Sequence, residues 1–254
     1  PELKAIVQMH GVPTHPGVIS WDTLLRRAHD VDTADLEARL AVQTPDDVAT
    51  LIYTSGTTGV PKAVMLTHDN IGWTAAAGTA ALGIHAGDDI LSYLPLSHIA
   101  EQIVSLFGPV TFGGCTWFAE SMATLGSDLQ EIRPDFFLGV PRVWEKIQER
   151  MQAAGAAGSP LRRKLIAWAR RVGLAAGYAE QQGQRRPLSY PLANALVFRA
   201  VRRRLGLDRA RVLVTSAAPI SLSTLEFFLS LGLPICEVYG MSECTGPGTI
   251  STPH

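Results

Sequence analysis

The stretch "YTSGTTGVPK", residues 53–62, gathers side chains that suit the binding of an anion. It continues an apolar run typical of a buried strand, and "TSGTTG" has the composition of a turn. Gly56 and Gly59 permit positive φ and close backbone approach, so consecutive N–H groups can converge on an anion. Lys62 adds a compact positive charge, and Pro61 stiffens the chain in front of it. Hydroxyl donors come from Thr54, Ser55, Thr57 and Thr58. We therefore expect this stretch to bind a polyphosphate.

The spacing of these residues excludes two common phosphate loops. A Walker A loop needs G-x-x-x-x-G-K-[ST], but Pro61 stands five residues after Gly56. The dinucleotide fingerprint G-x-G-x-x-G is absent from the chain. The sequence therefore argues against a P-loop kinase or GTPase and against a dinucleotide-binding loop.

The longer stretch "YTSGTTGVPKAVMLTHDN", residues 53–70, resembles the signature of the adenylate-forming superfamily. This superfamily contains acyl-CoA synthetases, luciferases and the adenylation domains of peptide synthetases. The resemblance implies that the loop surrounds the β- and γ-phosphates of ATP, with Thr57 and Lys62 taking part in catalysis. Ala63 stands where the family usually has glycine. The residues to which the resemblance assigns ATP contacts here are Thr54, Ser55, Gly56, Thr57, Thr58, Gly59 and Lys62.

Two further motifs follow in the order of that family. "YLPLSHIAEQ", residues 93–102, resembles the segment that lines the acyl pocket, and the resemblance places His98 opposite the carboxylate-bearing substrate. "VPRVWEKI", residues 140–147, resembles a pattern of long-chain fatty acyl-CoA synthetases. Without the neighbouring motifs, a lone histidine would more often be structural.

The last two motifs concern the nucleotide. "VTSAAPIS", residues 214–221, resembles the turn that packs against adenine, with Ser216 where glycine is more common. "EVYGMSECTG", residues 237–246, resembles the Y-G-x-T-E motif. By that resemblance Tyr239 stacks on adenine, Ser242 places a hydroxyl near the α-phosphate, and Glu243 binds Mg²⁺, which prefers hard oxygen ligands. The expected AMP-binding residues of these two motifs are Ser216, Ala217, Ala218, Pro219, Tyr239, Gly240, Met241 and Ser242.

Together the motifs most resemble the bubblegum type of long-chain acyl-CoA synthetase. The resemblance implies two steps: a fatty acid carboxylate attacks the α-phosphorus of ATP, and the thiol of coenzyme A then displaces AMP. It implies ATP, Mg²⁺ and coenzyme A as cofactor and co-substrates. The expected ribose-binding aspartate and C-terminal lysine domain have no counterpart up to His254. The chain therefore resembles an internal fragment, residues 1–254 of a partial AMP-binding domain, and we expect it to turn over poorly alone. Another ligase of the superfamily (for medium-chain, aryl or amino acids) and a non-catalytic nucleotide-binding protein stay open.

Strand-like and helix-like patterns alternate along the chain, which predicts an α/β fold with mostly parallel sheets and helices on both faces. A helical, basic insertion is expected at about 154–206. Strands are expected at 3–9, 48–53, 63–67, 90–94, 115–119, 135–139, 211–215 and 234–239. Helices are expected at 69–82, 98–108, 121–132, 141–153 and 221–231.

The net charge of −1 hides an uneven distribution. Residues 142–211 hold 16 of the 22 basic residues and four acidic ones, giving that segment about +12. On a helical wheel, one face of residues 161–172 carries Leu161, Leu165, Trp168 and Val172, and the opposite face carries arginines. Such a helix either lies on an anionic membrane surface or packs its apolar stripe on the sheet. Nucleic-acid binding is not expected, because interleaved aromatic residues are lacking. We expect a cytoplasmic protein, because the three cysteines are scattered and a signal-peptide pattern is lacking. If the helix binds lipid, the protein would be peripheral on a membrane surface.

Overall fold

The computed structural model describes residues 5–11, 15–55 and 59–252, and these fall into two compact units, 1–47 and 48–254. In the first unit two short strands pair in parallel and two helices follow. The side chains of Ser20 and Asp32 cap these helices by accepting hydrogen bonds from the N–H groups of Thr23 and Ala34. The elements are β1 (Ile6–Gln8), β2 (Val18–Ser20), α1 (Trp21–Ala28) and α2 (Thr33–Ala41). The strand expected at 3–9 is therefore present as β1.

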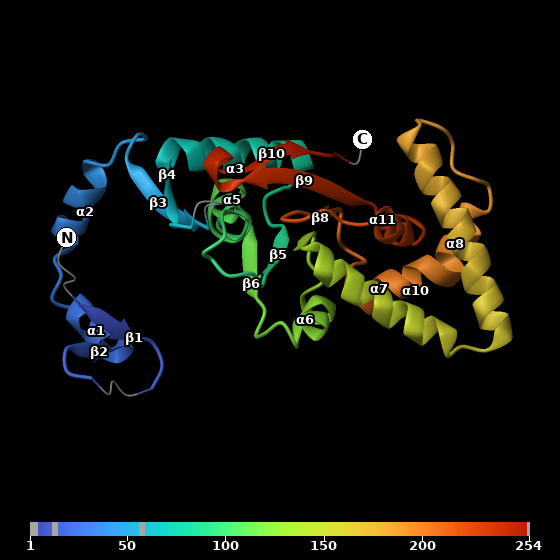
Figure 1. Ribbon diagram of the computed structural model, residues 1–254, viewed down its shortest axis with the longest axis horizontal. Coiled ribbons are helices and arrows are strands. Elements are labelled where there is room, and N and C mark those ends of the chain that lie inside the picture. Colours follow the sequence, from blue (N-terminus) through green and yellow to red (C-terminus); the bar gives the residue numbers. More distant parts are fainter. Residues whose placement is uncertain (1–4, 12–14, 56–58, 253–254) are drawn as a thin grey trace. The chain divides into compact units, whose positions relative to one another are not determined.

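A six-stranded sheet forms the centre of the second unit, in the order β10-β9-β8-β7-β5-β6 (Figure 1). The neighbouring strands from β9 to β6 run parallel, and β10 alone is antiparallel to its neighbour. The strands are β5 (Asp89–Ser92), β6 (Cys115–Phe118), β7 (Phe136–Gly139), β8 (Val212–Thr215), β9 (Ile235–Met241) and β10 (Gly246–Ile250). The expected mostly parallel sheet is confirmed, and β10 is a strand that the sequence did not predict.

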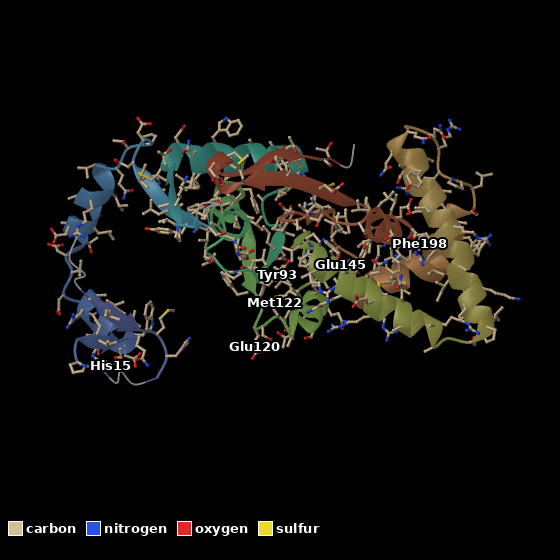
Figure 2. The ribbon with its side chains drawn as sticks, in the orientation of Figure 1. His15, Tyr93, Glu120, Met122, Glu145 and Phe198 are labelled. Carbon is tan, nitrogen blue, oxygen red and sulfur yellow. The ribbon has the colours of Figure 1, made fainter. Side chains whose placement is uncertain are left out.

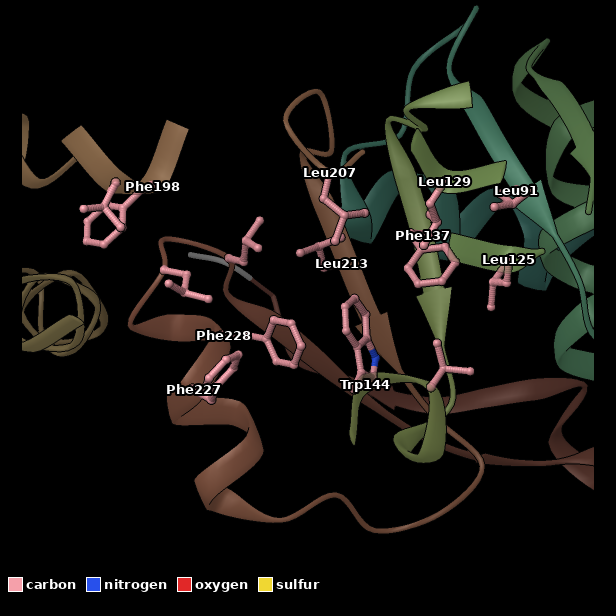
Figure 3. Packing of buried hydrophobic residues seen from close by; sticks show 14 of the residues in the cluster. Leu91, Leu125, Leu129, Phe137, Trp144, Phe198, Leu207, Leu213, Phe227 and Phe228 are labelled. Carbon is pink, nitrogen blue, oxygen red and sulfur yellow. The ribbon is translucent and has the colours of Figure 1, made fainter. Parts of the chain in front are cut away.

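Alternate residues of the parallel strands enter two separate cores, as the strand period of two requires. Ile90 and Phe136 belong to one buried cluster, whereas their neighbours Leu91 and Phe137 belong to the other. In the cluster that contains Leu91 and Phe137, the Trp144 ring contacts the rings of Phe137 and Phe228 edge to face, at centroid distances of 5.4 and 5.0 Å (Figure 3). Both faces of the sheet are thus covered, as the α/β pattern predicts.

Helices cover the two faces unequally. Leu82, Ala100 and Phe112, from α3, α4 and α5, pack on the Ile90 face. The opposite face carries α6, α7, α8, α10 and α11 (Figure 1). The helices are α3 (His68–Leu82), α4 (Ile99–Gln102), α5 (Gly108–Phe112), α6 (Leu125–Ile132), α7 (Pro141–Ala156), α8 (Pro160–Gln181), α9 (Tyr190–Ala193), α10 (Arg199–Leu205) and α11 (Leu222–Leu229). Two π-helical turns, η1 (Ile103–Phe107) and η2 (Asn194–Phe198), join α4 to α5 and α9 to α10.

The strands on either side of the phosphate loop form a separate antiparallel hairpin, β3 (Val48–Thr54) with β4 (Lys62–Thr67). The sequence predicted both strands, but their apolar runs carry no signal of pairing direction. The loop is therefore a hairpin connection rather than part of a parallel crossover.

In helix α8 only part of the apolar stripe expected at residues 161–172 packs against the core. The buried face of this helix consists of small residues, and a Cβ at Gly173 or Gly177 would clash with α11 or the turn after it. Leu161 is 79% exposed, and Trp168 and Val172 are only half-buried against the core. The apolar stripe therefore flanks the packed face, because glycine and alanine let the helix backbone approach its neighbours closely. Within the described residues no helix is long and apolar enough to cross a membrane.

Candidate functional site

The residues that flank the phosphate loop face each other across the β3–β4 hairpin. Thr54 pairs with Lys62, and Tyr53 pairs with Ala63. Gly59 has a φ of +91°, a conformation that glycine adopts without strain. Lys62 is exposed and forms no ion pair with any described residue. The hairpin thus holds the two ends of the loop together, with Lys62 free to meet an anion. Gly56, Thr57 and Thr58 lie outside the described residues.

The "THDN" end of the first motif sets the start of helix α3. The Thr67 hydroxyl accepts a hydrogen bond from the Asn70 N–H, and the Asn70 side chain accepts one from the Thr67 N–H. This capping box fixes the turn from β4 into α3. Ile52 from β3 and Ile71 from α3 then share a buried cluster with Ile99 of α4. The phosphate hairpin is therefore anchored to the helix that follows His98.

His98 stands at the N-terminus of α4 and is exposed, with no capping hydrogen bond from its side chain. One turn later Glu101 is almost fully buried, and its carboxylate accepts hydrogen bonds from the hydroxyls of Ser92 and Ser105. Ser92 is the last residue of β5, so Glu101 ties α4 to the end of that strand. Nothing in the sequence singles out Glu101, because a glutamate in a polar motif is normally expected at the surface.

The turn predicted to contact adenine begins at the end of β8. The Ser216 hydroxyl donates a hydrogen bond to the Val238 carbonyl of β9 at 3.0 Å. Ala217 has a φ of +77°, which is unusual for a residue with a side chain. Ala218 and Pro219 are exposed. The small residues therefore present backbone at a turn that is held against β9.

The residues of the Y-G-x-T-E motif occupy the end of β9 and a tight 3₁₀ turn, η3 (Ser242–Cys244). Tyr239 is 68% exposed, and Glu243 is also exposed. A Cβ at Gly240 would lie 1.9 Å from the Gly246 carbonyl oxygen, so only glycine fits beside β10. Ser242 is half-buried, and Met241 is exposed.

Strand β10 connects this motif to the His98 helix. Gly246 pairs with Met241 across the β9–β10 ladder. A Cβ at Gly246 would lie 3.9 Å from Ile99 and 3.8 Å from Ile103. Four segments therefore lie around one end of the parallel strands: the β3–β4 hairpin, helix α4 after His98, the turn at residues 216–219, and the last motif. This is the carboxyl end, where open α/β sheets bind ligands.

"VPRVWEKI" supports the other motifs from within the core. The Val140 N–H, just before α7, donates to the Tyr93 hydroxyl of the second motif at 3.0 Å; Figure 2 labels Tyr93. The Trp144 indole N–H donates to the Val214 carbonyl of β8 at 3.3 Å. Burial raises the pKa of Tyr93 to about 12, with a smaller contribution from the Glu101 charge. Neither Tyr93 nor Trp144 has an individual role predicted from the sequence, because both hydrogen bonds join segments that are far apart in the chain.

Comparison with known families tests the resemblance over nearly the whole chain. The profile of the family described as AMP-binding enzyme matches residues 3–254. The chain belongs to the AMP-binding enzyme family.

Curated members of this family match the chain closely. It is 47% identical over 263 residues to the long-chain-fatty-acid–CoA ligase ACSBG2 of Xenopus laevis, a match that covers 100% of this chain and 36% of that ligase. It is 42% identical over 255 residues to the human ACSBG2, and 39% identical over 263 residues to the ACSBG1 ligase of Rattus norvegicus. Those matches cover 98% and 100% of this chain and 38% and 36% of the ligases. The predicted bubblegum type is therefore confirmed, and the chain spans about a third of the length of these relatives.

Solved structures of AMP-binding enzymes share the fold. The adenylation domain of a carboxylate reductase from Mycobacterium chelonae gives a TM-score of 0.63 at 22% identity, covering 89% of this chain and 31% of that one. The N-terminal domain of FACL13 from Mycobacterium tuberculosis gives 0.58 at 16% identity, covering 94% and 48%. At these identities the likeness establishes the architecture alone.

An apolar cavity of about 80 Å³ lies between the Ile90 face of the sheet and α3, α4 and η1. It reaches the adenine turn, because Ser216 and Val238 are among its lining residues. It also reaches the second motif, because Ala100, two residues after His98, lines it. The cavity thus extends from the second motif to the turn predicted to contact adenine.

The residues present fit a magnesium ion held jointly with a nucleotide. Mg²⁺ in nucleotide sites is usually bound by one or two carboxylates together with phosphate oxygens. Glu243 offers one exposed carboxylate, and among the described residues no three acidic, histidine or cysteine side chains form a stand-alone metal site. Glu243 is therefore suited to a metal that arrives with ATP.

Proposed function

We propose that this chain is the nucleotide- and acyl-binding part of an AMP-forming long-chain fatty acid–CoA ligase. The observation that carries the proposal is the apolar cavity that extends from α3 to Ser216 beside the His98 helix. The part of the fatty acyl chain nearest the carboxylate enters this cavity, and the carboxylate points toward His98 and the nucleotide. The names of the curated relatives support the same activity.

In the first step a carboxylate oxygen attacks the α-phosphorus of ATP and pyrophosphate leaves. Because both reactants are anionic, the site must position them and neutralise their charge. Lys62 and the loop hydroxyls of Thr54, Ser55, Thr57 and Thr58 bind the triphosphate. Glu243 holds Mg²⁺, which neutralises phosphate charge when it is bound.

The nucleoside is held at the two turns around β8 and β9. Tyr239 stacks on adenine, and the backbone of residues 216–219 packs against the base. Gly240, Met241 and Ser242 border the α-phosphate. In the second step the thiol of coenzyme A attacks the acyl carbonyl, loses its proton and displaces AMP.

Acid-dependent ATP–pyrophosphate exchange tests this function, carried out with the full-length protein that contains this chain. We expect exchange with hexadecanoate to exceed exchange with octanoate, benzoate or amino acids. Lys62→Ala should reduce it on the order of 100-fold, because a charge that stabilises the transition state is lost. Lys164→Ala, which removes an exposed lysine of α8, is the matched control and should leave the rate unchanged. Preference for benzoate or an amino acid would indicate another ligase of the family, and ATP binding without exchange would indicate a non-catalytic protein.

Peripheral membrane contact through helix 161–172 stays a prediction of the sequence. The exposed Leu161 and the arginines around it support it, whereas the half-burial of Trp168 and Val172 reduces the apolar surface on offer. Sedimentation with anionic liposomes at low salt tests the contact. A chain that stays in the supernatant contradicts it.

A further inference from the structure

A second cavity, of about 570 Å³, lies among α6, α7, α8 and α10. Its lining residues Leu129, Val197 and Phe227 belong to the buried cluster on the Phe137 face of the sheet. The proposed acyl cavity lies on the opposite, Ile90 face. The second cavity, here called the arginine cleft, is thus separate from the catalytic site, and its size is that of a small-molecule site.

The arginine cleft carries strong positive charge. Five arginines line it, from α7, α8 and α10, and within the described chain no aspartate or glutamate does. The ion pairs of the second unit involve other arginines, such as Arg133 with Asp208 and Arg209 with Asp135. None of the cleft arginines forms an ion pair with a described residue. The cleft arginines are Arg150, Arg162, Arg163, Arg170 and Arg204.

Arg170 is the most enclosed of these side chains. Its guanidinium lies 4.5 Å from the centre of the Phe227 ring, and its Nε–H donates to the Ser230 hydroxyl at 3.0 Å. Burial lowers the pKa of Arg170. A half-buried guanidinium with one neutral hydroxyl partner has donors left for an anion, and phosphate matches their planar geometry.

Between the arginines the wall of the cleft is apolar. Ile147 and Met151 come from α7, Ile166 from α8, and Val201 and Leu205 from α10. Free phosphate or a nucleotide would leave this surface in contact with water. The cleft therefore combines the two chemistries of an amphiphile, an apolar chain and an anionic head.

We propose that the arginine cleft binds one molecule of long-chain acyl-CoA, with the acyl chain on the apolar wall and the phosphates on the arginines. Because the arginines come from three helices, they suit a head group with several phosphates better than they suit a fatty acid, which has a single carboxylate. The choice of acyl-CoA among such amphiphiles rests on the proposed function, because acyl-CoA is the product of that reaction. The cleft is then a second site, outside the catalytic one, that holds product.

Equilibrium dialysis of the 254-residue chain with palmitoyl-CoA below its micelle concentration tests the site. The variant is R163E/R204E, and the control is R171E/R199E, which changes exposed arginines of the same two helices that do not line the cleft. Both variants change the net charge equally. We expect the cleft variant to bind at least about tenfold more weakly, because phosphate contacts are replaced by repulsion, and the control to bind within about twofold of wild type. Circular dichroism should show that both are folded.

Several results would overturn the proposal. Equal weakening in both variants would mean non-specific attraction, and no weakening in either would place palmitoyl-CoA elsewhere, such as the Ile90-face cavity. If palmitate or free coenzyme A bound as tightly as palmitoyl-CoA, the cleft would not need both an acyl chain and phosphates, which would contradict the proposal. Co-sedimentation with phosphatidylglycerol vesicles that depends on Arg163 and Arg204, without binding of monomeric palmitoyl-CoA, would assign the cleft to a membrane. The exchange assay reports separately on the proposed function, so the two can fail independently.

Discussion

The hydroxyl of Ser216, just after the end of β8, donates a hydrogen bond at 3.0 Å to the backbone carbonyl of Val238 in the middle of the neighbouring strand β9. Both residues also line the apolar cavity. One side chain thus joins the turn assigned to adenine, the strand that carries Tyr239 and the space assigned to the acyl chain. Glycine, the residue expected here from the family resemblance, could not make this bond.

Replacing Ser216 should loosen this junction. Ser216→Ala removes the hydrogen bond and leaves the Val238 carbonyl without that partner, at a cost of about 1 kcal/mol in the free energy of unfolding. ATP affinity should fall with it, because the turn is less firmly held. Urea unfolding and ATP binding measure the two effects. Ser127→Ala, which removes an exposed hydroxyl bonded only within its own helical turn, is the control; equal losses in both variants would deny Ser216 its joining role.

Ala217 stores backbone strain next to Ser216. Its φ of +77° costs a non-glycine residue about 1 kcal/mol or more. Ala217→Gly should therefore raise the free energy of unfolding by up to about 1 kcal/mol. Ala218→Gly, at the next position, should lower it, because there glycine only adds freedom to the unfolded chain. A destabilised Ala217→Gly variant in urea unfolding would show that the turn carries no strain.

The close contact of Gly240 with β10 predicts a large effect of one methyl group. A Cβ at Gly240 would lie 1.9 Å from the Gly246 carbonyl oxygen, whereas at Gly248 the nearest atom is 3.6 Å away. Gly240→Ala should cost about 2 kcal/mol or more, because the β9–β10 pair must separate, and Gly248→Ala should cost much less. Thermal unfolding compares the two. Similar melting temperatures would mean that the strands adjust without cost.

The sequence was most informative where a pattern is local. The strands ending at Gly139 and Thr215 were predicted because short apolar runs with turn residues after them are typical of buried parallel strands. The residues of the phosphate loop were found because hydroxyl, glycine and lysine crowd into one turn, whereas the residues of the other motifs were found through the family resemblance. Both signals can be read within a few neighbouring residues.

What the sequence missed depends on contacts between distant residues. Strand β10 contains "GPGTI", whose glycines and proline are poor strand formers, and it exists because it pairs with β9 and packs on Ile99. The buried face of α8 was misjudged because a helical wheel assigns burial to large apolar residues such as Leu161. The face that is buried contains Gly173, which has no side chain and lets the helix backbone approach its neighbours closely. The role of Glu101 follows from Ser92 nine residues away, which no periodicity reveals.

Chain-length preference can be tested by filling the apolar cavity from α3. Gly78 lines the cavity, and no atom lies within 4 Å of where its Cβ would be. Gly78→Phe should place a ring in the space of the acyl chain and shift pyrophosphate exchange from hexadecanoate toward octanoate by about tenfold, since each excluded methylene is worth about 0.8 kcal/mol. Gly72→Phe, on the exposed side of the same helix, is the control. An unchanged preference in Gly78→Phe would place the acyl chain elsewhere.

Tyr93 predicts how stability depends on alkaline pH. Its pKa is raised from 10.0 to about 12 in the folded chain, mainly by burial. Below pH 10 the phenol is protonated in both states, so its contribution to stability is fully present. As pH rises from 10 toward 12 the unfolded chain loses this proton first, and the free energy of unfolding falls by up to about 1.4 kcal/mol per pH unit.

Tyr93→Phe loses the acceptor of the Val140 N–H, costing about 1 kcal/mol at neutral pH, yet its stability should fall less steeply above pH 10. Urea unfolding of both proteins across this range measures the slopes, and equal slopes would mean that the Tyr93 phenol ionises as readily in the folded chain as in the unfolded one.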